Sequence, residues 1–264
     1  MLTLKIYTAY FLQFLKQRLA YKGDFFASIL ANITATLAGL LFILFLLDGK
    51  VVQGLKGWSR EEVLFIYGYS MIAMALFSTF ATNLYQFGDR YVIQGQFDRV
   101  LLRPLGTLGQ VLFESFNLQS IGSLAVGVLV ILYTGERLDL TFGVLDYLWL
   151  FVSCASGATI LLSIFIFLAS LSFHFEDRIG IAPPFYNLIA FGRYPLPVFN
   201  HTLQFILRWV VPFAFVAFYP ATHFMDRSGF EFFCYLTPVI AVICFGVACV
   251  GWRFGVSRYT STGS

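Results

Sequence analysis

Long apolar runs alternate with short polar segments along the whole chain. A membrane-spanning helix needs about 20 apolar residues to cross about 30 Å of hydrocarbon, and six stretches meet this length. They are Phe25–Leu47, Val63–Tyr85, Gln110–Tyr133, Leu145–Phe173, Leu203–Tyr219 and Phe232–Trp252. The pattern predicts an all-α polytopic membrane protein, with six transmembrane helices in a single domain over residues 1–264.

Two of these stretches depart from the ordinary length of a span. Leu145–Phe173 is long enough to tilt or to extend past the bilayer. Leu203–Tyr219 is short and carries Pro212, which removes a backbone donor from a helix. We therefore expect the fifth span to be kinked or to cross the membrane incompletely.

The first 22 residues predict an amphipathic helix that lies in the membrane interface. Lys16 and Arg18 interrupt the place where the apolar region of a signal peptide would run. Apolar and aromatic residues recur at helical spacing on one face, and lysines and other polar residues occupy the opposite face. The apolar face consists of Ile6, Tyr7, Tyr10, Phe11, Phe14 and Leu15.

Composition agrees with this class, because 59% of the residues are hydrophobic and only 12% are charged. Soluble domains typically carry about 25% charged residues. If the N-terminus is inside, 12 Lys and Arg residues fall in inside segments and 5 in outside loops. Positive residues gather on the cytoplasmic side of membrane proteins, so we expect both termini in the cytoplasm.

The sequence carries little that resembles catalytic or metal-binding chemistry. It lacks a phosphate-binding loop, a zinc-protease motif and a nucleophile elbow. The four cysteines form no C-x-x-C pair and fall within apolar runs. We therefore predict no catalytic residues, no metal and no cofactor on this chain, and nothing indicates nucleic-acid binding.

Polar residues inside spans are candidates for a substrate path, because they are costly in lipid. Those considered are Asn32, Asn83, Glu114 and Asn117. Glu114 and Arg208 lie at similar depths, which favours either an ion pair or two side chains that reach separately to the interface. The few polar groups and many aromatic residues suit an amphipathic or lipid-like solute better than an ion.

Small residues recur every four positions in the first span, at Ala27, Ala31, Ala35 and Gly39. Such spacing lets another helix approach closely. The sequence is compatible with packing inside one subunit or between two.

The segment "GQFDRVLLRPLGTLGQ" between spans two and three resembles the type-2 (ABC-2-type) class of ABC-transporter permeases. It is similar in particular to a bacterial branch with the pattern G-x-F-D-R-x-L-L-R-P-L. The segment "GRYPLPVFNHTLQFILRWVVPFAFVAFYPA" is similar to that branch's region around span five. The resemblance covers nearly the whole chain.

This resemblance implies a membrane-spanning subunit of an ATP-driven exporter in the bacterial cytoplasmic membrane, surrounded by lipid. Two copies of a separate ATPase subunit would hold the ATP and Mg, and a second permease, identical or homologous, would complete the transporter. The substrates of the branch are antibiotics, peptides or lipid-like molecules. Two alternatives stay open: an ion-coupled transporter or channel, and a membrane-embedded lipid-modifying enzyme.

An ATPase on a separate chain needs a mechanical contact with the permease. We expect Tyr91–Arg103 to form a short cytoplasmic coupling helix in which Arg99 and Arg103 share one face, ended by Pro104, which can begin the next helix. Phe97, Val100 and Leu101 would fill an apolar groove of the partner. The residues assigned to this contact are Phe97, Asp98, Arg99, Leu101, Arg103 and Pro104. A second cytoplasmic loop with Glu176, Asp177 and Arg178 is expected between spans four and five.

Overall fold

The computed structural model describes residues 2–48, 57–175, 182–225, 227 and 229–260, and all regular secondary structure among these residues is helical. This confirms the all-α fold. Five helices are long and apolar enough to cross a membrane, and a bent pair of segments would make a sixth span. The α-helices are α1 (Leu2–Ala20), α2 (Lys22–Asp48), α3 (Arg60–Tyr85), α4 (Phe97–Leu101), α5 (Thr107–Phe113), α6 (Ser120–Arg137), α7 (Val144–Leu171), α8 (Ala182–Leu188), α9 (His201–Phe205), α10 (Phe218–Ala221) and α11 (Glu231–Arg258).

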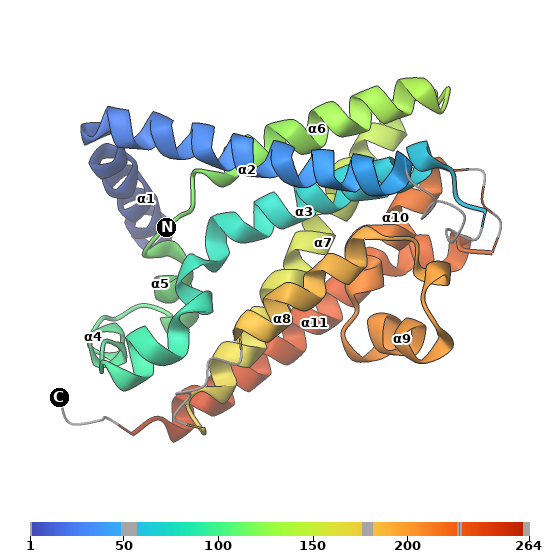
Figure 1. Ribbon diagram of the computed structural model, residues 1–264. Helices are drawn as coiled ribbons and strands as arrows, with labels where there is room; N and C mark the ends of the chain where they lie inside the picture. The colour runs from blue at the N-terminus through green and yellow to red at the C-terminus, as the bar shows by residue number, and fades with distance from the viewer. Residues whose placement is uncertain (1, 49–56, 176–181, 226, 228, 261–264) are drawn as a thin grey trace.

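Helix α3 lies at the centre of the molecule, packed against α6 and α7, while α7 also packs along α11 (Figure 1). Every residue from 62 to 73 in α3 is buried. Helix α2 is just as apolar, yet it packs mainly on α6. Only 6% of its apolar stretch is buried, compared with 72% for α3. An apolar helix without protein around it faces lipid or another subunit.

Glycines bring α3 and α6 into close contact. A Cβ atom on Gly127 of α6 would lie 3.2 Å from the carbonyl oxygen of Gly68 on α3, and a Cβ on Gly68 would lie 2.9 Å from Val130. Both positions are therefore closed to larger residues unless the two helices separate. This is the small-residue packing that membrane helices use in the absence of a hydrophobic driving force.

The third crossing differs from the expected span Gln110–Tyr133. The chain forms the short helix α5, leaves helical geometry over residues 114–119, and starts the crossing helix α6 at Ser120. At this break the Asn117 backbone N–H donates to the Thr79 carbonyl of α3 at 3.0 Å instead of to its own chain segment, and the Ser120 hydroxyl donates to the Asn117 carbonyl at 2.6 Å. Such side-chain bonds to the backbone compete with helix formation.

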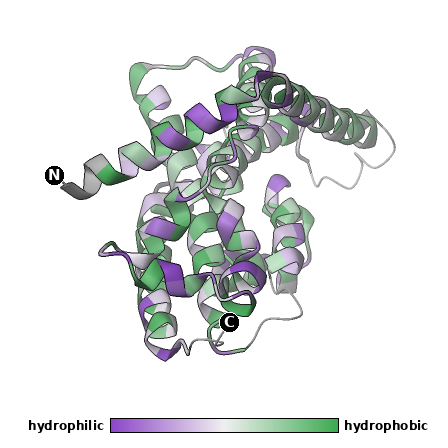
Figure 2. Cartoon of the chain, turned by 90° about the vertical axis from the view of Figure 1, so that its left-hand side faces the viewer, coloured by the Kyte–Doolittle hydropathy of each residue, from purple (hydrophilic) through white to green (hydrophobic). Residues whose placement is uncertain are grey.

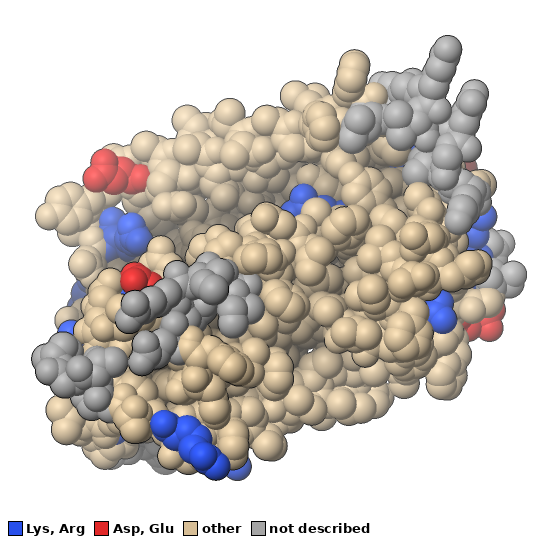
Figure 3. Space-filling view, turned by 60° about the horizontal axis from the view of Figure 1, so that its bottom comes forward, with Lys and Arg blue, Asp and Glu red and all other residues tan. Residues whose placement is uncertain are grey.

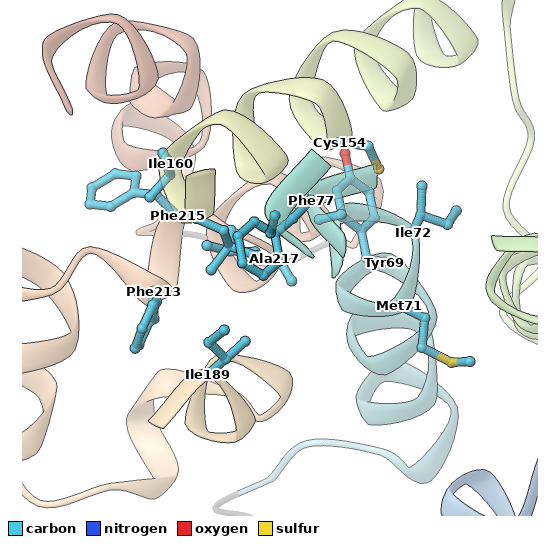
Figure 4. Close-up of a cluster of buried hydrophobic side chains, with 14 of the residues drawn as sticks. Tyr69, Met71, Ile72, Phe77, Cys154, Ile160, Ile189, Phe213, Phe215 and Ala217 are labelled. Carbon is cyan, nitrogen blue, oxygen red and sulfur yellow. The ribbon is translucent and has the colours of Figure 1, made fainter. Parts of the chain in front are cut away.

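The fifth region is broken where the proline predicts a break. Segments His201–Val210 and Phe213–Phe224 are bent by 75° on either side of Pro212. The second segment enters the core: Phe213, Phe215 and Ala217 are buried and lie with Ile189 between α3 and α7 (Figure 4).

Residues 182–193 lie along the transmembrane helices and not in a cytoplasmic loop. Ile189 is buried, and the guanidinium of Arg193 lies 5.6 Å from the ring centroid of Tyr67 in α3. Tyr67 is roughly 10 Å along α3 from Arg60 and roughly 27 Å from Tyr85, at 1.5 Å per residue. Arg193 is one of the 12 positive residues that were counted on the inside, which places it with the residues at the Tyr85 end of α3. This placement is wrong, because Arg193 lies nearer the Arg60 end. The predicted loop residues Glu176, Asp177 and Arg178 fall outside the described residues.

Both ends of the described chain lie at the same end of the bundle, and α1 runs across that end at a steep angle to α2 (Figure 1). Hydrophilic residues gather on α1 and on neighbouring short segments, whereas the long helices are mostly hydrophobic (Figure 2). Part of the apolar face of α1 contacts protein: Tyr7 lies 5.1 Å from Phe113, and Phe11 lies 5.1 Å from Phe116, measured between ring centroids.

Candidate functional site

The charged segment between α3 and α5 is not one helix over Tyr91–Arg103. It begins with a π-helical turn at Gly88–Ile93, reverses at Gly95 with φ of +66°, and continues as the five-residue helix α4. A positive φ suits glycine and is costly for most other residues. The next helix, α5, starts at Thr107 and not at Pro104. The short lengths of these pieces follow from the glycines and the proline between them.

Phe97 lies inside the protein, which corrects its predicted role as an anchor in a partner's groove. Its side chain is 0% exposed, and its ring lies 4.9 Å from Phe173 and 6.1 Å from Trp252 between centroids. Val100 is also buried. Phe97 therefore fixes α4 to the adjoining ends of α7 and α11. Burial and the neighbouring Asp98 carboxylate raise the pKa of Tyr259, next in this cluster, to about 12.

The outward side of α4 and the turn after it form an exposed surface, which we call the α4 face. At its centre, Leu101 is 46% exposed and Leu102 is 85% exposed. Arg99 and Arg103 flank these leucines, but they do not share a helical face because α4 ends at Leu101. Arg99 lies 3.9 Å from Glu114, and Arg103 donates a hydrogen bond of 3.0 Å to Tyr10 of α1. Pro104 is exposed beside them.

A polar network joins this segment to the end of α3. Glu114 accepts a hydrogen bond from Tyr91 and lies 3.6 Å from Arg90. Arg90 also donates to the side-chain oxygen of Asn83 at 2.8 Å, and the Asn83 amide nitrogen donates to the Val111 carbonyl at 2.7 Å. Glu114 and Asn83 are thus parts of one internal network in which each has a charged partner. Asn83, a candidate for the substrate path, is therefore bonded to Arg90 and to the Val111 carbonyl.

Of the two alternatives for Glu114 and Arg208, the ion pair does not form. The Arg208 guanidinium lies 4.8 Å from the ring centroid of Phe233 and 5.7 Å from that of Tyr219. Cation–π contacts of this kind satisfy an arginine without an acidic partner. Arg208 therefore holds the bent fifth region against the beginning of α11.

Two cavities follow α3. The first, the Tyr85 cavity of about 370 Å³, is lined by Phe77, Ser78, Ala81, Thr82, Tyr85, Gln86, Asn117, Phe165 and Tyr186. The second, the Arg193 cavity of about 310 Å³, lies between α2, α3, α6 and residues 182–193. The polar groups that line it are Asn32, Thr36, Tyr67, Ser78, Asn117, Ser120, Ser123, Tyr186 and Arg193.

The two cavities share Ser78, Asn117 and Tyr186. Together they extend from Tyr67 to Gln86, which is roughly 28 Å along the axis of α3. The surface seen in Figure 3 is mostly uncharged between its two ends, with one basic patch in a hollow near the middle. The arrangement provides a partly polar track along most of the length of a transmembrane helix.

The structure separates the four predicted path residues into two pairs. Asn32 and Asn117 line the Arg193 cavity, whereas Asn83 and Glu114 belong to the polar network at the Tyr85 end of α3. Arg193 was not among the predicted path residues, because it lies outside the six predicted spans and was one of the 12 positive residues counted in the inside segments. The sequence signal that identifies it is the apolar stretch 185–191 just before it, which is unlike a solvated loop.

The small-residue stripe of α2 borders the Arg193 cavity. Ala27, Ala31 and Ala35 are exposed, while Gly39 is half-buried, with Tyr67 next to it. Helix α6 contacts another face of α2, where Asn32 accepts a hydrogen bond from Ser123 at 2.8 Å. The close-approach surface of α2 is therefore not used by the part of this chain that the structure describes.

Residues 33–263 match a family described as ABC-2 family transporter protein. No curated protein and no solved structure matches the chain. In the described ranges, no three His, Cys, Asp or Glu side chains come together in a way that would hold a metal ion.

Proposed function

Because the chain belongs to the ABC-2 transporter family, we propose that it is the permease subunit of an ATP-driven exporter that moves an amphipathic antibiotic-, peptide- or lipid-like substrate. In this proposal a separate ATPase subunit, present in two copies, binds ATP and Mg. The transporter lies in a bacterial cytoplasmic membrane, with both termini of this chain in the cytoplasm. A second permease, identical or homologous, packs against the exposed stripe Ala27, Ala31 and Ala35 of α2.

The observation that carries the proposal is the α4 face. Exposed leucines flanked by arginines, at the end of the molecule where both termini lie, have the composition of a docking site with an apolar centre and a polar rim. Leu102 is the most exposed of these leucines, at 85%. We assign it as the central contact with the ATPase, although the sequence alone directed attention to Phe97.

The internal contacts of α4 support transmission of a movement into the bundle. Phe97 connects α4 to α7 and α11, and the Glu114–Arg90–Asn83 network connects it to α3. A displacement of α4 by the ATPase would therefore be transmitted to three of the long helices. One of them, α3, lines both cavities, so the substrate track lies next to the element that would move.

The test is to purify the tagged full-length chain from its native membranes and to identify any phosphate-loop ATPase that co-purifies in stoichiometric amount. Binding of that ATPase is then measured for Leu102→Ala. Burying a leucine side chain typically contributes about 1.5–3 kcal/mol, so its truncation should weaken binding by at least about 10-fold. Substrate-stimulated ATPase activity should fall in parallel.

The matched control is Leu145→Ala, because Leu145 is 79% exposed and lies at the opposite end of the bundle. This substitution should leave ATPase binding unchanged. Native membranes that yield no phosphate-loop ATPase would contradict the proposed function. Wild-type binding and wild-type transport in Leu102→Ala would show that the α4 face is only a solvated surface.

A further inference from the structure

We propose that the Arg193 cavity binds the anionic head group of the transported amphiphile, a phosphate, carboxylate or sulfate, with Arg193 as its counter-ion. The inference rests on the proposed function, because it names the substrate class of that transporter. It begins from the place of Arg193. The side chain is half-buried alongside α3, beside Tyr67 and roughly 10 Å along that helix from Arg60.

Arg193 makes no hydrogen bond or ion pair with any other described residue; its neighbours are aromatic, with the Tyr67 ring 5.6 Å from the guanidinium. By contrast, Arg90, Arg99, Arg103 and Arg227 each have a hydrogen-bonding partner in the structure. A charged arginine costs roughly 2.5–3.5 kcal/mol at the centre of a bilayer and less toward the interface, so Arg193, roughly 10 Å along α3 from Arg60, carries a smaller cost. Arg208 also lacks an acidic partner, but two aromatic rings cover it and it lines neither cavity. Arg193 has one such ring and opens onto a cavity, where water or an anion completes its hydrogen bonds.

The chemistry of the cavity favours an anion. No acidic side chain is among its lining residues in the described part of the chain, so Arg193 is its only formal charge. Asn32 lines the cavity, and its side-chain oxygen accepts the Ser123 hydrogen bond, so this bond does not use its amide N–H donors. Thr36 and Ser123 share a further hydrogen bond of 3.0 Å. An amide and a guanidinium that both donate are typical of sites for carboxylate and phosphate oxygens.

The size of the cavity and its borders indicate a head group and not a whole molecule. A volume of about 310 Å³ is at the lower limit of ordinary ligand pockets. The cavity is bounded by α2, whose apolar residues are mostly exposed, including Leu30 and Leu37. An amphiphile would therefore place its anionic group beside Arg193 and its chains against α2 and the adjoining lipid.

The experiment measures binding to the purified full-length permease in a non-ionic detergent, by isothermal titration. The probes are dodecyl phosphate, the neutral dodecyl maltoside and inorganic phosphate. We expect saturable binding of dodecyl phosphate, weaker at high salt, and at least a 10-fold loss of affinity in Arg193→Gln. Arg193→Lys should retain part of the affinity, because it keeps the charge but loses the two-pronged geometry.

The control is Arg208→Gln, because Arg208 is also half-buried against aromatic rings but lies outside the cavity. It should bind dodecyl phosphate as the wild type does. The proposal is overturned if Arg193→Gln elutes as a folded protein and keeps wild-type affinity. It is equally overturned if the wild type binds dodecyl maltoside as tightly as dodecyl phosphate.

Inorganic phosphate distinguishes the two sources of the anion. Binding of free phosphate as tight as that of dodecyl phosphate would assign the site to a small anion and overturn its role in holding an amphiphile. Because titration uses the permease without an ATPase, this result is independent of the proposed function. Failure to find an ATPase would contradict the transporter assignment while leaving the anion site measurable.

Discussion

Replacing Gly157 with alanine should destabilise the protein, although alanine is the better helix former. Gly157 lies in the middle of α7, where the broken fifth region meets it. An added Cβ atom would lie 2.5 Å from the backbone carbonyl oxygen of Val216 and 3.2 Å from the Val216 Cα. These are backbone atoms of a buried segment, so no side chain can rotate away to make room.

The size of the effect follows from two opposing terms. An alanine in a helix interior is worth roughly 0.5–1 kcal/mol relative to glycine. Inserting a methyl group into a packed core typically costs about 1–3 kcal/mol, and the close approach at Val216 places this site at the upper end. The net change should therefore be a loss of about 2 kcal/mol. At roughly 2–4 °C per kcal/mol for a chain of similar size, Tm should fall by about 4–8 °C.

The assay uses buried thiols as reporters of unfolding. Cys154 and Cys234 are 2% and 1% exposed, so a fluorogenic maleimide reacts with them only when the helices separate. The half-buried Cys244 and Cys249 are replaced by serine in all proteins compared. Reaction is followed during heating of the protein in detergent.

Gly246→Ala is the matched control, since Gly246 also lies within a long helix but a Cβ there would meet nothing within 4 Å. It should raise Tm by about 1–4 °C through helix propensity alone. If Gly157→Ala were as stable as Gly246→Ala, the close packing of Val216 on α7 would be refuted. The position of the broken segment in the core would then need revision.

The remaining predictions concern α4, the polar network beside it and the orientation. Phe97→Ala should destabilise the protein by about 3–5 kcal/mol, because a fully buried ring is lost, whereas Phe232→Ala at a 73% exposed site should change Tm little; equal Tm values would contradict the buried Phe97. Asn83→Leu should lower Tm by an amount equivalent to about 1–3 kcal/mol, since it removes the hydrogen bonds that Asn83 makes with Arg90 and with the buried Val111 carbonyl; an unchanged Tm would refute this network. In a cysteine-free background and intact cells, an impermeant maleimide should label Val144→Cys and not Leu102→Cys, and the reverse pattern would overturn the orientation.

The sequence determined the helical class, most of the crossing segments and one of the irregularities. The lengths of the apolar runs were enough to locate α2, α3, α7 and α11, because a helix is the only element that satisfies its own backbone in lipid. Pro212 was enough to locate the break in the fifth region, because proline lacks the donor that a continuous helix needs. These are local properties, so a local reading finds them.

The sequence predicted only part of the candidate site. The charged segment after α3 was recognised from its composition, but the direction of its side chains was not. Phe97 and Leu102 are both apolar residues within the same short segment, and only the positions of Phe173 and Trp252 decide that Phe97 is internal and Leu102 exposed. Arg99 and Arg103 were expected on one face, yet the end of α4 turns them toward Glu114 and Tyr10.

Tertiary structure alone decided which apolar helix is central and where the charges lie in depth. Helices α2 and α3 are similarly hydrophobic, but α3 is enclosed by other helices and α2 is exposed. Lipid chains are as apolar as a protein core, so the hydrophobicity of a membrane helix does not indicate whether protein buries it. Arg193 reads as a cytoplasmic charge in the sequence, and the packing of residues 182–193 along α3 places it beside Tyr67. The sequence determines which segments dissolve in the membrane, while the contacts between them determine which of their polar groups face a cavity.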